Sequence, residues 1–385
     1  MTRRDFVSML ALASAAGWLD DLAPLQNLAP PPAGRLVRTM PLGRFDGAPV
    51  PPLGRVLGAG LDARQFSDLS RLAPDSLVTL TDQFFVRTAA SNAVAGSSPW
   101  TVGVSGRVRR PIDLSLDDLT PLVQSMGTHL LECSGNSDPA NFGLMSAARW
   151  SGVPIAALLD RAGPQPNASL VRVSGQDDDS RSWQTSVAGA SWIFSRDDLN
   201  RAGAFLATRM NDAPLTQDHG FPVRLVVPNW YGCVAIKWVT RIELVGDDEP
   251  ATSQMREFAA RTHQEGAPSV ARDFQPAVVD LAGMPIRVEQ WEDEGRVSYR
   301  VVGIRWGGTA PTRDLTIRFR YTQPFVRVDD CPAPPSTTTW SLWSHVWRPD
   351  LPGRYQIVLG TTDRAVRTRR LDLFYYTREV EIDRV

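Results

Sequence analysis

The segment from His129 to Asn136 could do chemistry with a sulfur atom. In its sequence, HLLECSGN, an apolar pair leads into Cys133, and small, turn-forming residues follow the cysteine. This pattern is typical of a strand end that delivers a thiol onto a loop, where the sulfur could bind a polarisable transition metal. A lone cysteine is more often a buried structural residue. These residues alone favour the structural interpretation.

A second segment, residues 218–238, gathers cationic and hydrogen-bonding side chains. His219 and Arg224 stand near the ends of one expected strand, and Lys237 stands on a second strand after a glycine turn. Arginine offers paired donors and lysine a point charge, so three such groups around one turn would bind an anion or a phosphate. Spacing alone fits equally well with two paired strands that carry solvated charges.

Motifs of the common enzyme classes are missing from the sequence. It contains no GxGxxG after a strand, no Walker A loop, no HExxH and no GxSxG. The three cysteines stand at neither metal-ligand nor redox spacing, and no CxxCH is present to attach a c-type haem. The formal net charge of -1 provides no basic excess, so we expect no nucleic acid partner.

The first residues predict export. Thr2-Arg3-Arg4-Asp5-Phe6 is a twin-arginine pattern, and a short apolar run from Val7 to Trp18 follows it. That run is too short to span a bilayer as a stable helix, and no second apolar stretch of transmembrane length follows. We therefore expect a twin-arginine signal, a periplasmic or exported protein, and no integral membrane segment after signal removal. The alternative is a disordered basic start.

The pattern of elements indicates two folded domains of different class. From about residue 77, short apolar strands alternate with short helices, which predicts an α+β domain. After Pro285, alternation of period two between frequent turns predicts a β-sandwich. The proline-rich residues 20–60 predict an extended arm with little regular structure. The resulting division is a signal and proline-rich arm (1–30), a catalytic domain (31–250), a linker (251–280) and the sandwich (281–385).

Three motif-bearing segments together resemble the sulfite oxidase family of molybdopterin enzymes over about residues 77–245. The order and approximate spacing of the motifs agree with that family. The strand-rich tail resembles the family's immunoglobulin-like dimerisation domain. The similar motifs are F-V-R at Phe85-Val86-Arg87, C-x-G-N at Cys133-Ser134-Gly135-Asn136, W-x-G-V-P-L at Trp150–Ile155, H-G-F-P-V-R at His219–Arg224 and V-K-W within Ala235–Trp238.

The resemblance implies a fold, a cofactor and residue roles. The implied fold is an α+β, sulfite-oxidase-type molybdopterin-binding domain followed by an immunoglobulin-like β-sandwich, with a possible homodimer. The implied cofactor is molybdenum-molybdopterin, with Cys133 as the metal ligand. The implied catalytic residues are Cys133, Arg87 and Trp183, the last in place of the family's substrate-side tyrosine. The implied cofactor-binding residues are Phe85, Val86, Arg87, Cys133, Ser134, Gly135, Asn136, Asp177, His219, Arg224, Ala235, Ile236 and Lys237.

The substrate pocket departs from the family pattern. Sulfite oxidases carry an arginine pair after C-x-G-N, whereas this sequence has Ser137 and Asp138, and Asp138 would repel a sulfite dianion. The CSGN sequence is also similar to the sulfane dehydrogenase branch, which is periplasmic and works with partner proteins. The resemblance implies oxygen-atom or two-electron transfer on a small sulfur compound or other oxyanion, with an external electron acceptor such as a cytochrome. The alternative is a cofactor-free binding or scaffold protein that retains the fold.

Overall fold

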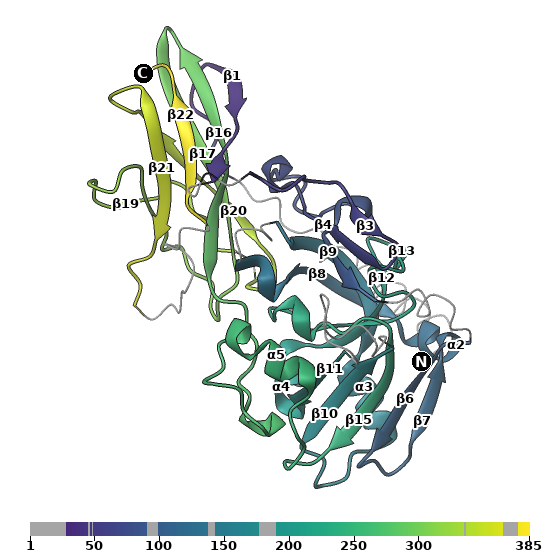
Figure 1. The fold of residues 1–385 in the computed structure, drawn as a ribbon. Helices are drawn as coiled ribbons and strands as arrows, with labels where there is room; N and C mark the ends of the chain where they lie inside the picture. The colour runs from purple at the N-terminus through teal and green to yellow at the C-terminus, as the bar shows by residue number, and fades with distance from the viewer. Residues whose placement is uncertain are drawn as a thin grey trace, which may run out of the picture.

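A computed structural model of the 385-residue chain describes residues 28–44, 47, 49–90, 99–137, 143–176, 190–334, 336–364 and 376–385. The predicted twin-arginine signal lies outside the described residues, as do Asp138, Asp177 and Trp183. In the described part the structure is mostly β, with four short α-helices. Figure 1 shows two bodies side by side, one built from the central part of the chain and one from its last hundred residues.

Two five-stranded sheets form most of the central body, here called the catalytic domain. The first has the order β11-β10-β15-β6-β7, and β15 runs parallel to β6. The second has the order β13-β12-β9-β8, with β14 paired to β12. The strands of the first sheet, in that order, are Ser191–Ser195, Leu170–Gly175, Val239–Val245, Thr101–Gly106 and Ile112–Ser115; those of the second are Ala213–Pro214, Phe205–Met210, Met145–Pro154, Gln124–Glu132 and Arg224–Val226.

Short helices cover these sheets. The longest is α3 (Ile155–Ala162), in which Ile155, Leu158, Leu159 and Ala162 form one buried face at helical spacing. The helix ends at Gly163, whose φ of 69° fits the left-handed conformation that glycine adopts readily. This helix agrees with the short helices that the sequence predicts among the strands of this domain. The other α-helices are α2 (Leu116–Leu119), α4 (Arg196–Ala202) and α5 (Ser253–Glu257).

The last hundred residues supply most of two further sheets, which pack face to face. Their shared core contains Val301 and Trp343 from one sheet and Ile317 and Ile357 from the other, all fully buried. The sheet orders are β1-β16-β17-β20 and β19-β18-β21-β22-β2. The strands are, in chain order, Arg35–Met40 (β1), Gly43–Arg44 (β2), Ala282–Asp293 (β16), Arg296–Trp306 (β17), Thr316–Arg318 (β18), Val326–Arg327 (β19), Ser341–Trp347 (β20), Gly353–Gly360 (β21) and Arg378–Ile382 (β22).

Residues 35–44 correct the sequence analysis. We predicted an irregular arm there and assigned residues from 31 onward to the catalytic domain. Instead β1 pairs with β16, with Met40 opposite Val288, and β2 pairs with β22. The partners of these two strands lie far along the chain, so no local pattern could reveal the pairing.

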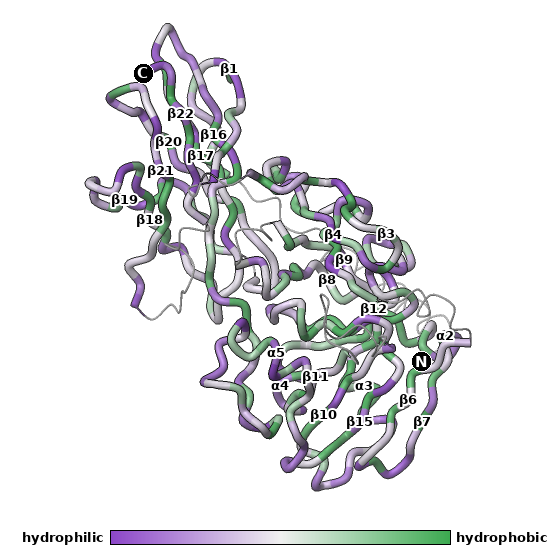
Figure 2. Tube along the Cα trace, viewed as in Figure 1, coloured by the Kyte–Doolittle hydropathy of each residue, from purple (hydrophilic) through white to green (hydrophobic). Residues whose placement is uncertain are grey.

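The two bodies share a buried boundary. One apolar cluster joins Leu130, Met145 and Tyr231 of the catalytic domain to Met284 and Trp306 of the C-terminal sheets. Figure 2 shows hydrophobic stretches along the strands of both bodies and more hydrophilic turns at the ends of the sheets. Within the described residues, no helix has the length and apolar character needed to cross a membrane.

Candidate functional site

Cys133 lies at the end of β8, on a short turn. Its backbone N–H donates to the carbonyl of Leu144 at 2.9 Å, and residues Ser134–Ser137 then form a 3-10 turn. The Gly135 N–H points back at the thiol and lies 3.4 Å from Sγ. The side chain of Cys133 is half-buried. The structure therefore confirms the predicted strand end that carries a thiol onto a loop.

Two buried polar side chains, Asn136 and Glu132, hold the Cys133 turn in place by hydrogen bonds. Nδ2 of Asn136 donates to Oε1 of Glu132 at 3.1 Å, and Oδ1 of Asn136 accepts from the Leu144 N–H at 2.9 Å. Oε2 of Glu132 accepts from Nε1 of Trp306 at 2.8 Å. Asn136 and Glu132 are fully buried. Asn136, predicted to bind the cofactor, thus uses its amide to hold the loop that carries the thiol.

Two guanidinium groups, those of Arg87 and Arg261, act on the thiol, and a third, that of Arg64, lies beside Arg87. Arg87 lies on β5 (Val86–Ala89) and stands opposite Arg64 on β4 (Asp62–Gln65), within a three-stranded sheet completed by β3 (Leu57–Ala59). Burial lowers the pKa of Arg87, and the like charge of Arg64 lowers it further. Burial raises the pKa of Cys133, while the Gly135 N–H and the charges of Arg87 and Arg261 oppose that rise. The arginines thus favour a thiolate, which burial disfavours.

Gly135 separates the thiol from Arg261. A Cβ built on Gly135 would lie 3.6 Å from Sγ of Cys133 and 3.5 Å from Nη1 of Arg261. The guanidinium and the sulfur therefore face the same small space, which a side chain at position 135 would fill. Arg261 lies on the 3-10 turn Ala259–Thr262, inside the segment predicted to be a linker.

Lys237 joins the second predicted segment to the strand of Arg87. Its Nζ donates to the backbone carbonyls of Arg87, at 3.3 Å, and of Asp218, and to the hydroxyl of Thr88. The two segments are thus in contact on the far side of the Arg87 strand. The sequence placed Lys237 on a strand, but it lies just before β15, between Ile236 and Trp238.

Arg224 is a buried cation at this junction. Its Nη1 donates to the His219 carbonyl at 3.1 Å and its Nη2 to the Ala235 carbonyl at 3.3 Å. Its Nε has no hydrogen-bond partner among the described residues. Burial lowers the pKa of Arg224 to about 10, although the charge of Asp218 opposes this effect. The group remains charged at neutral pH and has a donor to spare for an anionic ligand.

His219 lies beside Arg224 as a neutral imidazole. The side chain is buried, and its ring makes an edge contact with Phe84 at a centroid distance of 5.2 Å. Burial lowers the pKa of His219 from 6.5 to about 4, against the opposing charge of Asp218. A neutral histidine offers one donor and one acceptor at neutral pH. The sequence analysis placed this residue on a strand, whereas it lies in the turn before β14.

The remaining predicted residues fall into two groups. Phe85 and Ala235 belong to the apolar cluster against which Cys133 packs. Their sequence neighbours Val86 and Ile236 are also buried, as is Ser134, which follows Cys133. Asp177 and Trp183 lie outside the described residues. Sequence reasoning missed Arg64 and Arg261, because neither belongs to a motif and only the folded chain brings Arg261 to the thiol and Arg64 to Arg87.

These groups fit a molybdenum cofactor held by one protein sulfur. No three His, Cys, Asp or Glu side chains gather as a metal site in the described residues, so one thiolate would have to suffice as the protein's metal ligand. A pterin with its own sulfur ligands and a phosphate supplies the remaining coordination and needs cationic donors. Arg87, Arg224 and Lys237 provide such donors, and the unpartnered Nε of buried Arg224 fits an absent anion.

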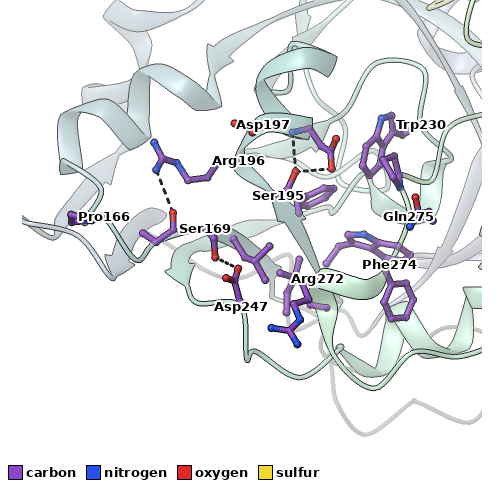
Figure 3. Close-up of a pocket in the computed structure, with 18 residues that line it drawn as sticks. Pro166, Ser169, Ser195, Arg196, Asp197, Trp230, Asp247, Arg272, Phe274 and Gln275 are labelled. Carbon is purple, nitrogen blue, oxygen red and sulfur yellow. Dashed lines mark hydrogen bonds between the residues drawn. The ribbon is translucent and has the colours of Figure 1, made fainter.

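A cavity of about 480 Å³ lies elsewhere in the catalytic domain, between β11, α4 and residues 271–276 (Figure 3). Its polar groups bind one another: Ser195 Oγ caps α4 by accepting from the Asp198 N–H at 3.0 Å, and Ser169 bonds Asp247. None of the described residues that we predicted for cofactor binding lines it. This cavity is therefore separate from the Cys133 site.

Comparisons with known proteins agree with this geometry. Residues 90–253 match the family described as "Oxidoreductase molybdopterin binding domain". The chain is 30% identical over 250 residues to mitochondrial sulfite oxidase of Macaca fascicularis, covering 60% of this chain and 46% of that protein. It is 28% identical over 236 residues to the NADPH nitrate reductase of Beauveria bassiana, covering 54% of this chain and 26% of that protein. The chain thus spans less than half of these curated relatives.

One solved structure shares the fold over most of the chain. The sulfane dehydrogenase SoxCD of Paracoccus pantotrophus matches with a TM-score of 0.62 and 17% sequence identity, covering 86% of this chain and 89% of that chain. The family match contains Cys133 and the second segment, while Arg87 and Arg64 stand just before it. By its domain match and its relatives, the central part of this chain is a molybdopterin-binding oxidoreductase domain similar to that of the sulfite oxidases.

Proposed function

We propose that the protein is an exported molybdenum-cofactor oxidoreductase that transfers an oxygen atom or two electrons on a small sulfur compound or other oxyanion. The observation that carries this proposal concerns the half-buried thiol of Cys133. The thiol and the guanidinium of Arg261 face the same small space, and the positive charge of Arg87 acts to lower the pKa of the thiol. A sulfur atom suits molybdenum, and the arginines suit an anion.

Each group has a definite task in this proposal. Cys133 would bind the metal through its sulfur, and the bound cofactor would supply two-electron oxygen-atom transfer. Arg224 and neutral His219 would hold the pterin and its phosphate by hydrogen bonds, and Lys237, whose three donors are bonded to protein oxygens, would contribute its positive charge. Arg87 would face the anionic substrate, because its guanidinium acts on the Cys133 thiol while its backbone carbonyl is already bound by Lys237.

The names of the relatives support a sulfur substrate. Both the mitochondrial protein and the structural match carry sulfur chemistry in their names, as sulfite oxidase and sulfane dehydrogenase. We propose a sulfur oxyanion or sulfane sulfur for this chain on that basis. The electrons would leave to a separate acceptor such as a cytochrome, which a ferricyanide or cytochrome c reduction assay would detect.

Metal analysis tests the proposal directly. Protein produced with molybdate in a host that makes the cofactor is expected to contain about one molybdenum and one pterin per chain. Cys133→Ser should lose the metal and the activity while its circular dichroism stays unchanged. Cys331→Ser is the matched control, because Cys331 is also half-buried but bonds Arg305 in the C-terminal sheets. Wild-type protein that folds, is active and lacks molybdenum would exclude the proposal and favour a cofactor-free role.

Export and assembly are further parts of the proposal. The Arg3-Arg4 pair supports a twin-arginine signal, and changing both residues to lysine is expected to leave the protein in the cytoplasm. The two face-to-face C-terminal sheets support the proposed immunoglobulin-like sandwich, whose family counterpart dimerises. Light scattering of purified protein should then give twice the chain mass, and a single-chain mass would refute the homodimer.

A further inference from the structure

We infer that Arg261 is a substrate-binding residue that recognises a small divalent oxyanion beside Cys133, in place of the arginine pair that this sequence lacks at positions 137 and 138. The inference rests on the proposed function and names one residue of its substrate pocket. It concerns a segment, residues 251–280, for which the sequence indicated only a connection between domains.

The backbone at Arg261 is firmly held. The N–H of Arg261 donates to the Phe258 carbonyl at 3.0 Å. Its neighbours Ala259 and Thr262 are buried, and the hydroxyl of Thr262 bonds the Phe258 carbonyl at 2.9 Å. Gln264 ties the turn to residue 275 through hydrogen bonds in both directions, at 3.0 and 2.7 Å. The turn therefore holds the exposed arginine at a fixed place.

The guanidinium of Arg261 is directed at the thiol. It lies over the ring of Phe258 at 5.7 Å, and Phe258 itself packs against the main apolar core of the catalytic domain. Such a ring holds a cation in place without removing its charge. On its other side, Nη1 of Arg261 and Sγ of Cys133 both lie within contact distance of the point where Gly135 lacks a Cβ. A ligand on the sulfur side of Gly135 would thus meet this guanidinium.

The charges around this space call for an anion. Arg261 faces it, the charge of Arg87 acts on the same thiol, and the charges of Arg64 and Arg261 both act against that of Arg87. The carboxylates nearby are Glu257, Asp62 and the buried Glu132, whose two oxygens are already bonded to Asn136 and Trp306. These guanidinium charges repel one another, and an anion bound beside Cys133 would relieve that repulsion.

A structural role for Arg261 makes a different prediction. If it only balanced the exposed Glu257, its removal would change stability by less than about 1 kcal/mol and would not affect ligands. A substrate-binding role predicts a loss of anion affinity without a loss of fold or cofactor. Arg256 offers a matched control, because it is an exposed arginine on the adjoining helix α5.

The test is isothermal titration calorimetry of sulfate into the oxidised holoenzyme. Sulfate is used as the probe because it is a stable tetrahedral dianion. Arg261→Gln is expected to weaken sulfate binding about tenfold, since a charge-assisted hydrogen bond contributes on the order of 1.5–3 kcal/mol. Arg261→Lys should recover part of that affinity, and Arg256→Gln should bind as the wild type does.

The outcomes separate this inference from the proposed function. Equal sulfate affinity in wild type and Arg261→Gln, with full molybdenum content in both, would overturn the role of Arg261 and leave the enzyme assignment intact. Loss of molybdenum in Arg261→Gln would also overturn it, because the residue would then serve the cofactor. Wild-type protein without molybdenum or pterin would instead refute the proposed function itself.

Discussion

Trp306 of the C-terminal sheets donates a hydrogen bond of 2.8 Å from Nε1 to Oε2 of Glu132, the residue that precedes Cys133. Glu132 is fully buried, and its other oxygen accepts from Asn136, which in turn holds the Leu144 N–H. The thiol loop is therefore fixed from a strand of the other body, about 170 residues further along the chain. The C-terminal sheets therefore also contribute to the cofactor site, because Trp306 holds the residue that precedes Cys133.

Trp306→Phe is expected to loosen the cofactor site. The substitution removes one donor from a buried carboxylate and should lower the free energy of unfolding by about 3 kcal/mol. Because Glu132 adjoins the thiol, the purified variant should also retain less molybdenum after dialysis. Trp343→Phe is the control, since its indole donates to the Ile304 carbonyl at 3.0 Å within the C-terminal sheet. A similar molybdenum loss in both variants would contradict a specific link.

Gly135→Ala is expected to obstruct the site without unfolding the protein. The new methyl group would lie at ordinary contact distance, 3.5 to 3.6 Å, from Arg261 and Cys133. Thermal unfolding should therefore change little, while sulfate affinity of the holoenzyme falls. Gly360→Ala, in a C-terminal strand, should leave sulfate affinity unchanged. An unchanged affinity in Gly135→Ala would show that the ligand does not enter this space.

Glu257→Gln is expected to strengthen sulfate binding, whereas Gly135→Ala is expected to weaken it. Glu257 is an exposed carboxylate whose pKa is raised by burial, against the charges of Arg261 and Arg87. It competes with an anionic ligand for these two arginines. Removing its charge should tighten sulfate binding about twofold, a small effect because exposed charges are screened. Weaker binding in this variant would mean that Glu257 orients Arg261 instead.

His219 should make the protein less stable in mild acid. Burial holds its pKa near 4 in the folded state, against 6.5 when unfolded, so the unfolded chain binds more protons between these values. Stability therefore rises with pH through this window, and is lost as pH falls from 6.5 to 4. The loss attributable to His219 should approach about 3 kcal/mol. Urea unfolding of wild type and His219→Gln at several pH values measures the stability difference, which should change between pH 4 and 6.5 and become independent of pH above 7.

The apoprotein should carry Cys133 as a thiol at neutral pH. Burial raises its pKa above the ordinary 9.0, so its reaction with iodoacetamide at pH 7 should be slower than that of an unstructured cysteine. The rate should rise with pH beyond 9. In the holoprotein, peptide mass spectrometry should find Cys133 protected at every pH. Fast alkylation of the apoprotein at pH 7 would show that the arginines outweigh burial.

Local patterns predicted the elements that carry the site. The apolar pair before Cys133 and the turn-forming residues after it are readable over a few residues, and the structure confirms the strand end and the turn that they predicted. Resemblance to a family supplied the link between Arg87, Cys133 and the residues around Arg224. These segments do meet in the structure. Lys237 donates hydrogen bonds to the backbone of Arg87 and of Asp218, and the charge of Arg87 acts on the Cys133 thiol.

Features that depend on distant partners escaped prediction. Arg64 reaches the site only because β4 pairs with β5, and Arg261 only because the turn after α5 packs on the thiol loop. Both belong to segments with no motif of their own. The strands β1 and β2 were missed for the same reason. A short strand between prolines is too short to show a hydrophobic periodicity, so the sequence pattern does not predict the strand or its partner.

The pairing of β1 and β2 with β16 and β22 also sets an order of assembly. These strands are made early in synthesis, whereas the residues that lie opposite them, such as Val288 and Glu379, are made much later. The C-terminal sheets therefore close only after nearly the whole chain has been synthesised, across a loop of very high contact order. Trp306 lies on β17, which pairs with β16, so the hydrogen bond from Trp306 to Glu132 cannot form until a segment far beyond the cysteine loop has been made.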